Sequence, residues 1–279
     1  MGTLKIISAS ERAKQRNGVK ALIVGQAGIG KTSLLKTLDP ETTLFMDLEA
    51  GDLALGNEFP VDQVSPGTWQ ECRDLAVFLA GPDPQAAKKD VYGEDHYEHA
   101  LKEYGETDLG KYETYFLDSL TVASRICLRW AQQQPESVNA KGVPDMRSAY
   151  GLLGREMIRF VTQLQSARSK NVIFVCLLQE MTDEFKRVTY GYQLEGGKSK
   201  QEIPGIVDEV ITMCVQGKDA NNAGYRAFVT DPMNREGFPA KDRSGRLDPM
   251  EQPDLGLLIK KVLSSPGDGT PITSEEIPF

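Results

Sequence analysis

The sequence predicts an α/β fold in which a mostly parallel, twisted sheet is flanked by helices. Short apolar runs of strand length alternate with segments of helical periodicity, which is typical of parallel sheets joined by crossover helices. The runs are apolar almost without interruption, as expected of strands covered on both faces. The chain shows no second core and no internal repeat. We therefore expect one domain over residues 1–265 and a flexible acidic tail over 266–279.

The positions of these runs give the individual elements. Central strands are expected at residues 20–25, 43–49, 114–120 and 171–179. Two further strands, 209–215 and 225–231, should form an antiparallel hairpin near the C-terminus. Helices are expected at residues 31–38, 68–81, 121–134, 148–169 and 254–265. The polar segments 82–113 and 180–205 are expected to be irregular, the first as an insertion at the surface.

The composition excludes several classes of protein. A formal net charge of −8 argues against a protein that coats nucleic acid through bulk electrostatics, so any DNA contact must come from local basic patches or from many subunits together. The chain has no run of about 18 apolar residues and begins with a polar segment. We therefore expect a cytoplasmic protein without a membrane partner.

Cysteine and histidine chemistry is not expected. The four cysteines lie in apolar contexts without a C-x-x-C pair, which indicates buried thiols: Cys72, Cys127, Cys176 and Cys214. The only two histidines, His96 and His99, have a spacing that could hold a metal, but their polar surroundings favour a solvated loop.

A phosphate-binding loop follows the first strand. The segment "GQAGIGKT" matches G-x-x-x-x-G-K-[ST] in full, and it lies between a strand and a helix, which is the context that this motif requires. Lys31 should reach the β- and γ-phosphates of ATP, and Thr32 should bind Mg²⁺. The residues expected to contact the nucleotide are Gly25, Gln26, Ala27, Gly28, Ile29, Gly30, Lys31, Thr32 and Ser33. The chain lacks the N-K-x-D motif of guanine specificity and the signature of transporter ATPases.

Two further acids complete the expected site. Asp118 ends the apolar strand "YFLD" and is the expected second residue on the magnesium side. Ser119 follows it, whereas ring ATPases of the AAA+ type usually carry their catalytic glutamate at that position, so this residue counts against them. An acid that polarises the attacking water can come from "LFMDLE", where both Glu49 and Asp47 are available.

This set of residues resembles the RecA-like ATPases. In these proteins the sheet order is 5-1-4-3-2 and the catalytic glutamate ends the strand beside the aspartate strand, which implies Glu49 as the base next to Asp118. The alternative is Asp47, or a purely structural acid pair. The resemblance also implies that Gln179, in "VCLLQEM", senses the γ-phosphate. The alternative is a glutamine that only closes its strand.

The segment "FPAKDRSGRL" resembles the basic element of this superfamily, on Lys241 and Arg243. The resemblance implies that both cations reach the γ-phosphate of a neighbouring subunit, where they would stabilise the charge of the transferred phosphoryl group. Hydrolysis would then require a homo-oligomer, either a ring or a filament. The alternative is a solvated basic turn.

The resemblance can be narrowed to the short RecA-like ATPases encoded by bacteriophages and prophages. It covers about residues 18–265 and is carried by "DSLT", "RSAYGLLGREMIRFVTQL", "IPGIVDEVITM" and "AKDRSGRLD". It implies single-strand annealing or recombination in the bacterial host cytoplasm, helped by a single-strand-binding protein. The step from ATP to annealing is an analogy. Two other functions stay open: a ring-type DNA motor or helicase loader, and an ATP-gated adaptor that recruits repair proteins.

Two loops are implied as the single-stranded DNA site, at residues 135–150 and 180–203. The second contains cations and aromatic rings suited to phosphate contacts and base stacking, namely Lys186, Arg187, Tyr190, Tyr192, Lys198 and Lys200. Acidic residues in the same segment offset this charge, so an ordinary solvated loop stays possible. Basic residues also occur near the N-terminus and could form an arm: Arg12, Lys14, Arg16 and Lys20.

The chain ends in "SEEIPF", which resembles the acidic tip of bacterial single-strand-binding proteins. The residues that carry this likeness are Glu275, Glu276, Ile277, Pro278 and Phe279. The resemblance implies that Phe279 enters an apolar pocket of a repair protein that normally reads that tip. A tail with a chance ending is the alternative.

Overall fold

The sheet of the computed structural model has the strand order β10-β8-β7-β1-β5-β4-β2-β3, with β6 beside β5 and β9 beside β7. The structure describes residues 7–8, 10–11, 15, 17–56, 59–105, 108–139, 141–182, 184–217 and 223–264. The strands are β1 (Lys20–Gly25), β2 (Thr43–Asp47), β3 (Asp62–Val64), β4 (Thr114–Asp118), β5 (Asn171–Thr182), β6 (Val188–Tyr192), β7 (Glu209–Gln216), β8 (Tyr225–Val229), β9 (Lys241–Asp242) and β10 (Met250–Glu251).

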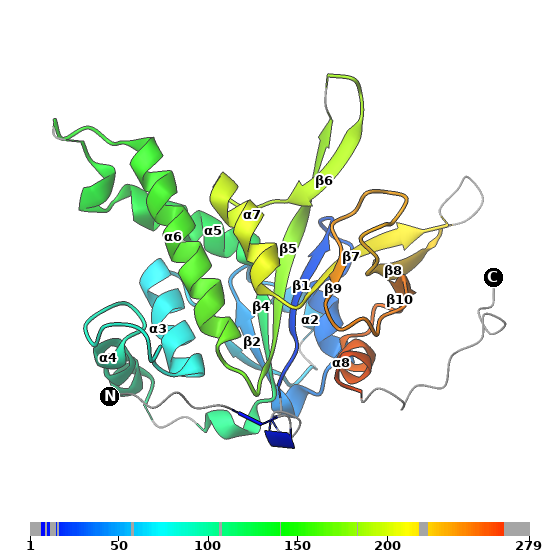
Figure 1. The fold of residues 1–279 in the computed structure, drawn as a ribbon, viewed down its shortest axis with the longest axis horizontal. Coiled ribbons are helices and arrows are strands. Elements are labelled where there is room, and N and C mark those ends of the chain that lie inside the picture. Colours follow the sequence, from blue (N-terminus) through cyan, green and yellow to red (C-terminus); the bar gives the residue numbers. More distant parts are fainter. Residues whose placement is uncertain are drawn as a thin grey trace.

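The helices cover both faces of this sheet. They are α2 (Asp52–Leu55), α3 (Trp69–Ala80), α4 (Glu94–Tyr104), α5 (Leu120–Gln132), α6 (Met146–Gln165), α7 (Gly197–Ile206) and α8 (Leu255–Leu263), with short 3-10 turns η1 (Thr32–Thr37), η2 (Pro40–Thr42), η3 (Leu109–Lys111) and η4 (Pro135–Ser137). One core lies under α3, α5 and α6, and the other lies under η1 and α8. Figure 1 shows these two groups of helices on opposite sides of the central strands.

The central strands confirm the expected sheet. β1 is parallel to both β5 and β7, β4 is parallel to β5, and β2 is parallel to β4. The order β7-β1-β5-β4-β2 corresponds to the order 5-1-4-3-2 of a RecA-like P-loop core, in which these parallel strands are numbered along the chain. β7 and β8 form the expected antiparallel hairpin. The carboxyl ends of β1, β4 and β2 therefore share one edge of the sheet, and that edge collects the residues of the expected site.

The segment 82–113 was expected to be irregular, but it contains helix α4. A buried Ala100 and contact between the rings of Phe78 and Tyr104, 5.2 Å apart, attach α4 to α3. The solvated loop expected around the histidines is also wrong. His96 accepts a hydrogen bond from the Tyr92 backbone N–H and pairs with Asp74 at 2.7 Å, so it joins α4 to α3.

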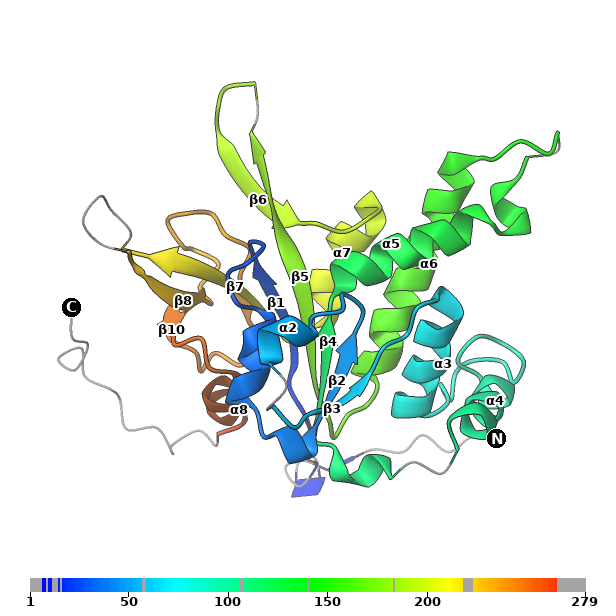
Figure 2. The ribbon, with the colours of Figure 1, turned by 180° about the vertical axis from the view of Figure 1, so that it is seen from behind.

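The segment 180–205 is also ordered rather than a long loop. β5 continues to Thr182 and returns as β6, and α7 follows. The hairpin is polar and exposed, so a hydropathy pattern does not reveal it. Tyr190 nevertheless packs against Phe238, with ring centroids 4.6 Å apart, and this contact attaches the hairpin to a segment distant in sequence. In Figures 1 and 2 this hairpin and the connection between α5 and α6 project from the same end of the molecule.

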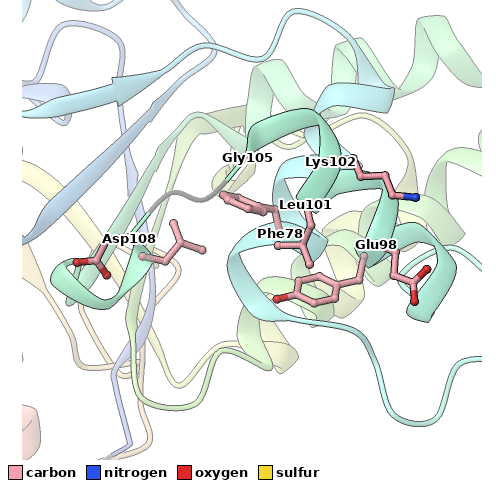
Figure 3. A pocket seen from close by; sticks show the side chains of 8 residues that line it. Phe78, Glu98, Leu101, Lys102, Gly105 and Asp108 are labelled. Carbon is pink, nitrogen blue, oxygen red and sulfur yellow. The ribbon is translucent and has the colours of Figure 1, made fainter.

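The remaining features of the fold concern the thiols and the surface. All four cysteines are buried, as expected, and burial raises the pKa of Cys72 to about 12. No described helix is both long and apolar enough to cross a membrane. A hollow of about 870 Å³ lies between α3, α4 and η3. Figure 3 shows the side chains of Phe78 and Leu101 within it, and these residues lie outside the phosphate loop and its acids.

Candidate phosphate and magnesium site

The phosphate loop turns sharply between β1 and η1. Gly28 and Gly30 have φ angles of 75° and 104°, a region that residues with a side chain rarely adopt. The side chain of Lys31 is folded back into the loop, where its Nζ donates to the carbonyl oxygens of Gly25 at 3.0 Å and Gln26 at 2.8 Å. Burial lowers the pKa of Lys31, and the charges of Asp118 and Glu49 oppose this shift. A cation held in this way is positioned for an incoming phosphate.

The two expected magnesium residues are in contact. Thr32 Oγ1 donates to Asp118 Oδ2 at 2.5 Å. Asp118 is 3% exposed, and burial raises its pKa to about 6, with a further contribution from the charge of Glu49. A carboxylate and a hydroxyl are the hard oxygen ligands that Mg²⁺ prefers, and this ion usually takes its other ligands from phosphates and water. The pair therefore fits the metal of a nucleotide complex.

The structure separates the roles of Asp47, the last residue of β2, and Glu49, two residues further on. Asp47 is 2% exposed and accepts hydrogen bonds from the backbone N–H groups of Glu49 and Gly51 and from the Gln63 side chain. These contacts hold the turn after β2. Glu49 is exposed, and its carboxylate accepts a hydrogen bond from the Ser119 hydroxyl. Glu49 is thus the acid that a water molecule can reach, beside Asp118 on the neighbouring strand.

Gln179 does not close its strand. β5 runs three residues further, and the Oε1 of Gln179 accepts a hydrogen bond from Lys200 Nζ at 2.9 Å. Lys200 belongs to α7, so this contact links the strand beside the phosphate loop to that helix. The alternative that Gln179 only closes its strand is therefore wrong. The sequence did not predict its contact with Lys200.

Lys241 and Arg243 hold the C-terminal end of α7 in their own chain. Lys241 Nζ donates to the carbonyl oxygens of Pro204 at 3.0 Å and Val207 at 2.7 Å. Arg243 forms an ion pair with Asp208 at 2.9 Å. Lys241 is therefore not simply solvated, whereas the Arg243 side chain, at 52% exposure, stays in contact with solvent beside its partner Asp208. Neither contact joins them to the phosphate loop of the same chain.

The expected DNA-binding residues divide into two groups. Lys186 and Arg187 are exposed at the turn between β5 and β6, and Lys198 is exposed on α7. The others are engaged in the fold: Tyr190 packs on Phe238, Lys200 contacts Gln179, and burial raises the pKa of Tyr192 to about 12.

The expected basic arm and the expected C-terminal tail lie mostly outside the described residues. Lys20 is not part of a basic arm, because it lies in β1 at 4% exposure and its Nζ donates to the carbonyl oxygens of Gly18 and Lys170. The other arm residues, Arg12, Lys14 and Arg16, lie outside the described residues, and so does the tail Glu275–Phe279.

Sequence reasoning missed two residues at the site. The Ser119 hydroxyl reaches Glu49, as noted above, and it also caps α5 by accepting from the Val122 N–H. Arg226, on β8, lies against Gly30 of the phosphate loop. No motif gives either residue a role at the site. Their proximity depends on the pairing of strands that are distant in sequence.

The chain is similar to one known protein family and, more distantly, to solved structures. A family model described as an AAA domain matches residues 17–244, whereas a search of curated proteins gives no match. A crystal structure of the RadB recombinase is 13% identical, with coverage of 77% of this chain and 80% of that chain and a TM-score of 0.40. An ATPase from the type III secretion system of pathogenic bacteria is 13% identical, with coverage of 71% and 51% and a TM-score of 0.39.

The family match bears on the meaning of Ser119. The match spans the phosphate loop, both acidic strands and the β7–β8 hairpin. Because the matched family carries the AAA name, the absence of an acid directly after Asp118 does not exclude the chain from that family. The chain belongs to the AAA domain family of P-loop ATPases.

Proposed function

We propose that this protein is an ATP-hydrolysing, RecA-like protein that oligomerises on single-stranded DNA and promotes annealing or recombination, with a single-strand-binding protein as helper. The observation that carries the proposal is the position of the β5–β6 hairpin. This hairpin grows directly out of β5, the strand next to β1, and it projects beyond the edge where the phosphate site lies (Figure 1). A change at the nucleotide can therefore reach it through one continuous strand.

The exposed residues of the projecting segments suit a flexible single strand. Phe185 is 74% exposed at the hairpin turn, with the Arg187 guanidinium 5.6 Å from its ring. Val143, between α5 and α6, is 53% exposed, and Tyr150, near the start of α6, is 39% exposed. Aromatic rings can stack on bases and nearby cations can meet phosphates, without sequence preference. Since the net charge of the chain is negative, we expect weak and salt-sensitive binding.

A chain of contacts supports coupling between ATP and the assembly. Gln179 contacts Lys200 on α7, and the C-terminal end of the same helix is held by Lys241 and Arg243. If these two cations exchange their partners for the phosphate of a neighbouring subunit, α7 loses its restraint at one end. Nucleotide, helix and neighbour would then change state together.

The proposal is tested by DNA binding and annealing. We would measure the fluorescence anisotropy of a labelled single strand at low salt, with Mg²⁺ and a non-hydrolysable ATP analogue, and then the annealing of complementary strands. Phe185→Ala combined with Lys186→Ala and Arg187→Ala should weaken binding by about tenfold or more. A matched variant, Lys88→Ala with Lys89→Ala, removes two exposed cations from the connection that precedes α4 and should bind like wild type.

Two results would contradict the proposal. One is a wild-type protein that binds the ATP analogue but no single-stranded DNA at low salt. The other is tight binding to duplex DNA that persists in high salt, because the counterion-dependent contacts expected here weaken as salt rises.

A further inference from the structure

Strand β8 places an arginine against the phosphate loop. β8 does not pair with β1, the strand before the loop, because β7 lies between them. The Nη1 of Arg226 lies 2.9 Å, and its Cζ 3.4 Å, from the point that a Cβ on Gly30 would occupy. A side chain at position 30 would displace the guanidinium from this place, and the φ angle of 104° at Gly30 also favours glycine. The guanidinium therefore lies directly against the backbone that is expected to hold the nucleotide phosphates.

The register of the hairpin fixes this placement. Arg226 is opposite Val215, two positions along from the pair of Met213 and Phe228. Side chains two residues apart on a strand share a face, and Met213 and Phe228 belong to the same core as Ile29 of the phosphate loop. Arg226 continues this face outward to the loop, where it is exposed to solvent.

The positive charge of Arg226 has no anionic partner among the described residues. Among the described residues, no carboxylate pairs with its guanidinium and no acceptor binds it. Its neighbour Gly30 directly precedes Lys31, and the loop presents backbone N–H groups. A cation beside a second cation and a row of N–H dipoles is electrostatically unfavourable until an anion joins them. Every group gathered at this point is suited to bind a phosphate.

We infer that Arg226 binds the phosphates of ATP or ADP within its own chain, in addition to Lys31. This inference rests on the proposed ATP binding and adds a residue to it. The loop backbone holds the α- and β-phosphates and Lys31 the β- and γ-phosphates, so Arg226 beside Gly30 should contact the α- or β-phosphate. A guanidinium can hold two phosphate oxygens at once. Its role differs from that proposed for Lys241 and Arg243, because it needs no neighbouring subunit.

The test is the affinity of the full-length protein for nucleotides. A fluorescent ADP analogue is titrated with Mg²⁺ present, and ATP, ADP and AMP are then measured by competition. Arg226→Gln should weaken binding of ATP and of ADP by a similar factor, about 10- to 100-fold. A loss for ATP and ADP without a loss for AMP would assign the contact to the β-phosphate, and an equal loss for all three would assign it to the α-phosphate. Arg226→Lys keeps the charge without the planar fork and should fall between wild type and Arg226→Gln.

Controls separate the inference from the proposed function. Arg155→Gln changes an exposed arginine on α6 and should bind nucleotide like wild type, as long as both variants unfold at the wild-type temperature. If wild type fails to bind ATP, the proposed function itself is wrong. If wild type binds and Arg226→Gln binds equally well, this inference alone is overturned, whatever happens to the rate of hydrolysis.

Discussion

At the scale of single residues, the contact between Ser119 and Glu49 gives the site its organisation. Glu49 lies at the end of one strand and Ser119 directly follows the metal-side aspartate of the next, so one hydrogen bond fixes the exposed carboxylate beside Asp118. Asp47, two residues away, is occupied by backbone N–H groups. Two acids that look interchangeable in the sequence are therefore different in the fold.

The first prediction concerns this hydroxyl. Ser119→Ala should lower kcat for ATP by about tenfold, because Glu49 loses the group that orients it, and it should cost about 1 kcal/mol of stability through the lost cap of α5. The matched control is Asp254→Ala, which removes the cap of α8. It should cost similar stability and leave kcat unchanged. Equal effects of both variants on kcat would show that Ser119 acts only as a cap.

A second prediction concerns Glu209, a buried acid at 1% exposure. Burial raises its pKa from 4.5 to about 7, and the charge of Asp242 adds to the shift. Between these two values the folded protein keeps a proton that the unfolded chain releases, so this group makes the protein less stable as pH rises.

Glu209→Gln should remove this part of the pH dependence. Relative to wild type, the variant should gain about 1–2 kcal/mol of unfolding free energy between pH 5 and pH 8, since one pKa unit corresponds to about 1.4 kcal/mol and solvent screens part of the effect. Urea unfolding of both proteins at the two pH values measures it. A difference that does not change with pH would contradict the assignment.

At the scale of elements, α3 and α6 are joined by a buried polar contact. Trp69 Nε1 donates to Glu156 at 2.8 Å, Arg73 lies 3.4 Å from the same carboxylate, and its guanidinium lies 4.8 Å from the Trp130 ring. Glu156→Ala should destabilise the protein by about 3 kcal/mol, because an indole N–H and a cation lose their shared acceptor. Glu156→Gln keeps an acceptor and should cost less. Equal losses in urea unfolding would disprove this explanation.

The strands of the core were predictable from the sequence, but several outer elements were not. A run such as residues 20–25 is apolar at nearly every position, so strand length and period identify it. α4, β6 and α7 carry polar faces, and they are stabilised by contacts with partners remote in sequence, such as Tyr190 with Phe238. Local pattern contains no information about such partners.

The candidate site shows the same division. The loop motif predicted Lys31 and Thr32, the end of an apolar strand predicted Asp118, and the resemblance to RecA-like ATPases implied Glu49, with Asp47 as the alternative; the structure brings these residues together. The contact of Ser119 with Glu49 and that of Arg226 with the phosphate loop depend on strand pairing, so the residue types alone gave no signal for either.

At the scale of the whole molecule, the proposed fingers require a neighbour. Glu49→Gln and Arg243→Ala should each abolish most hydrolysis, but an equal mixture should recover activity at about a quarter of the sites, where an intact Glu49 meets an intact Arg243 across an interface. The control is a mixture of Glu49→Gln with Lys31→Ala. Both residues belong to the subunit that binds the nucleotide, so this mixture should recover no activity. No recovery in the first mixture would contradict action between subunits.

The central claim is that ATP hydrolysis is coupled to single-stranded DNA. The most direct measurement is steady-state hydrolysis at low salt, with and without single-stranded DNA, for wild type and Glu49→Gln. We predict strong stimulation by DNA in wild type and its loss in the variant. A rate that stays negligible with DNA, in a wild-type protein that binds ATP, would contradict the account.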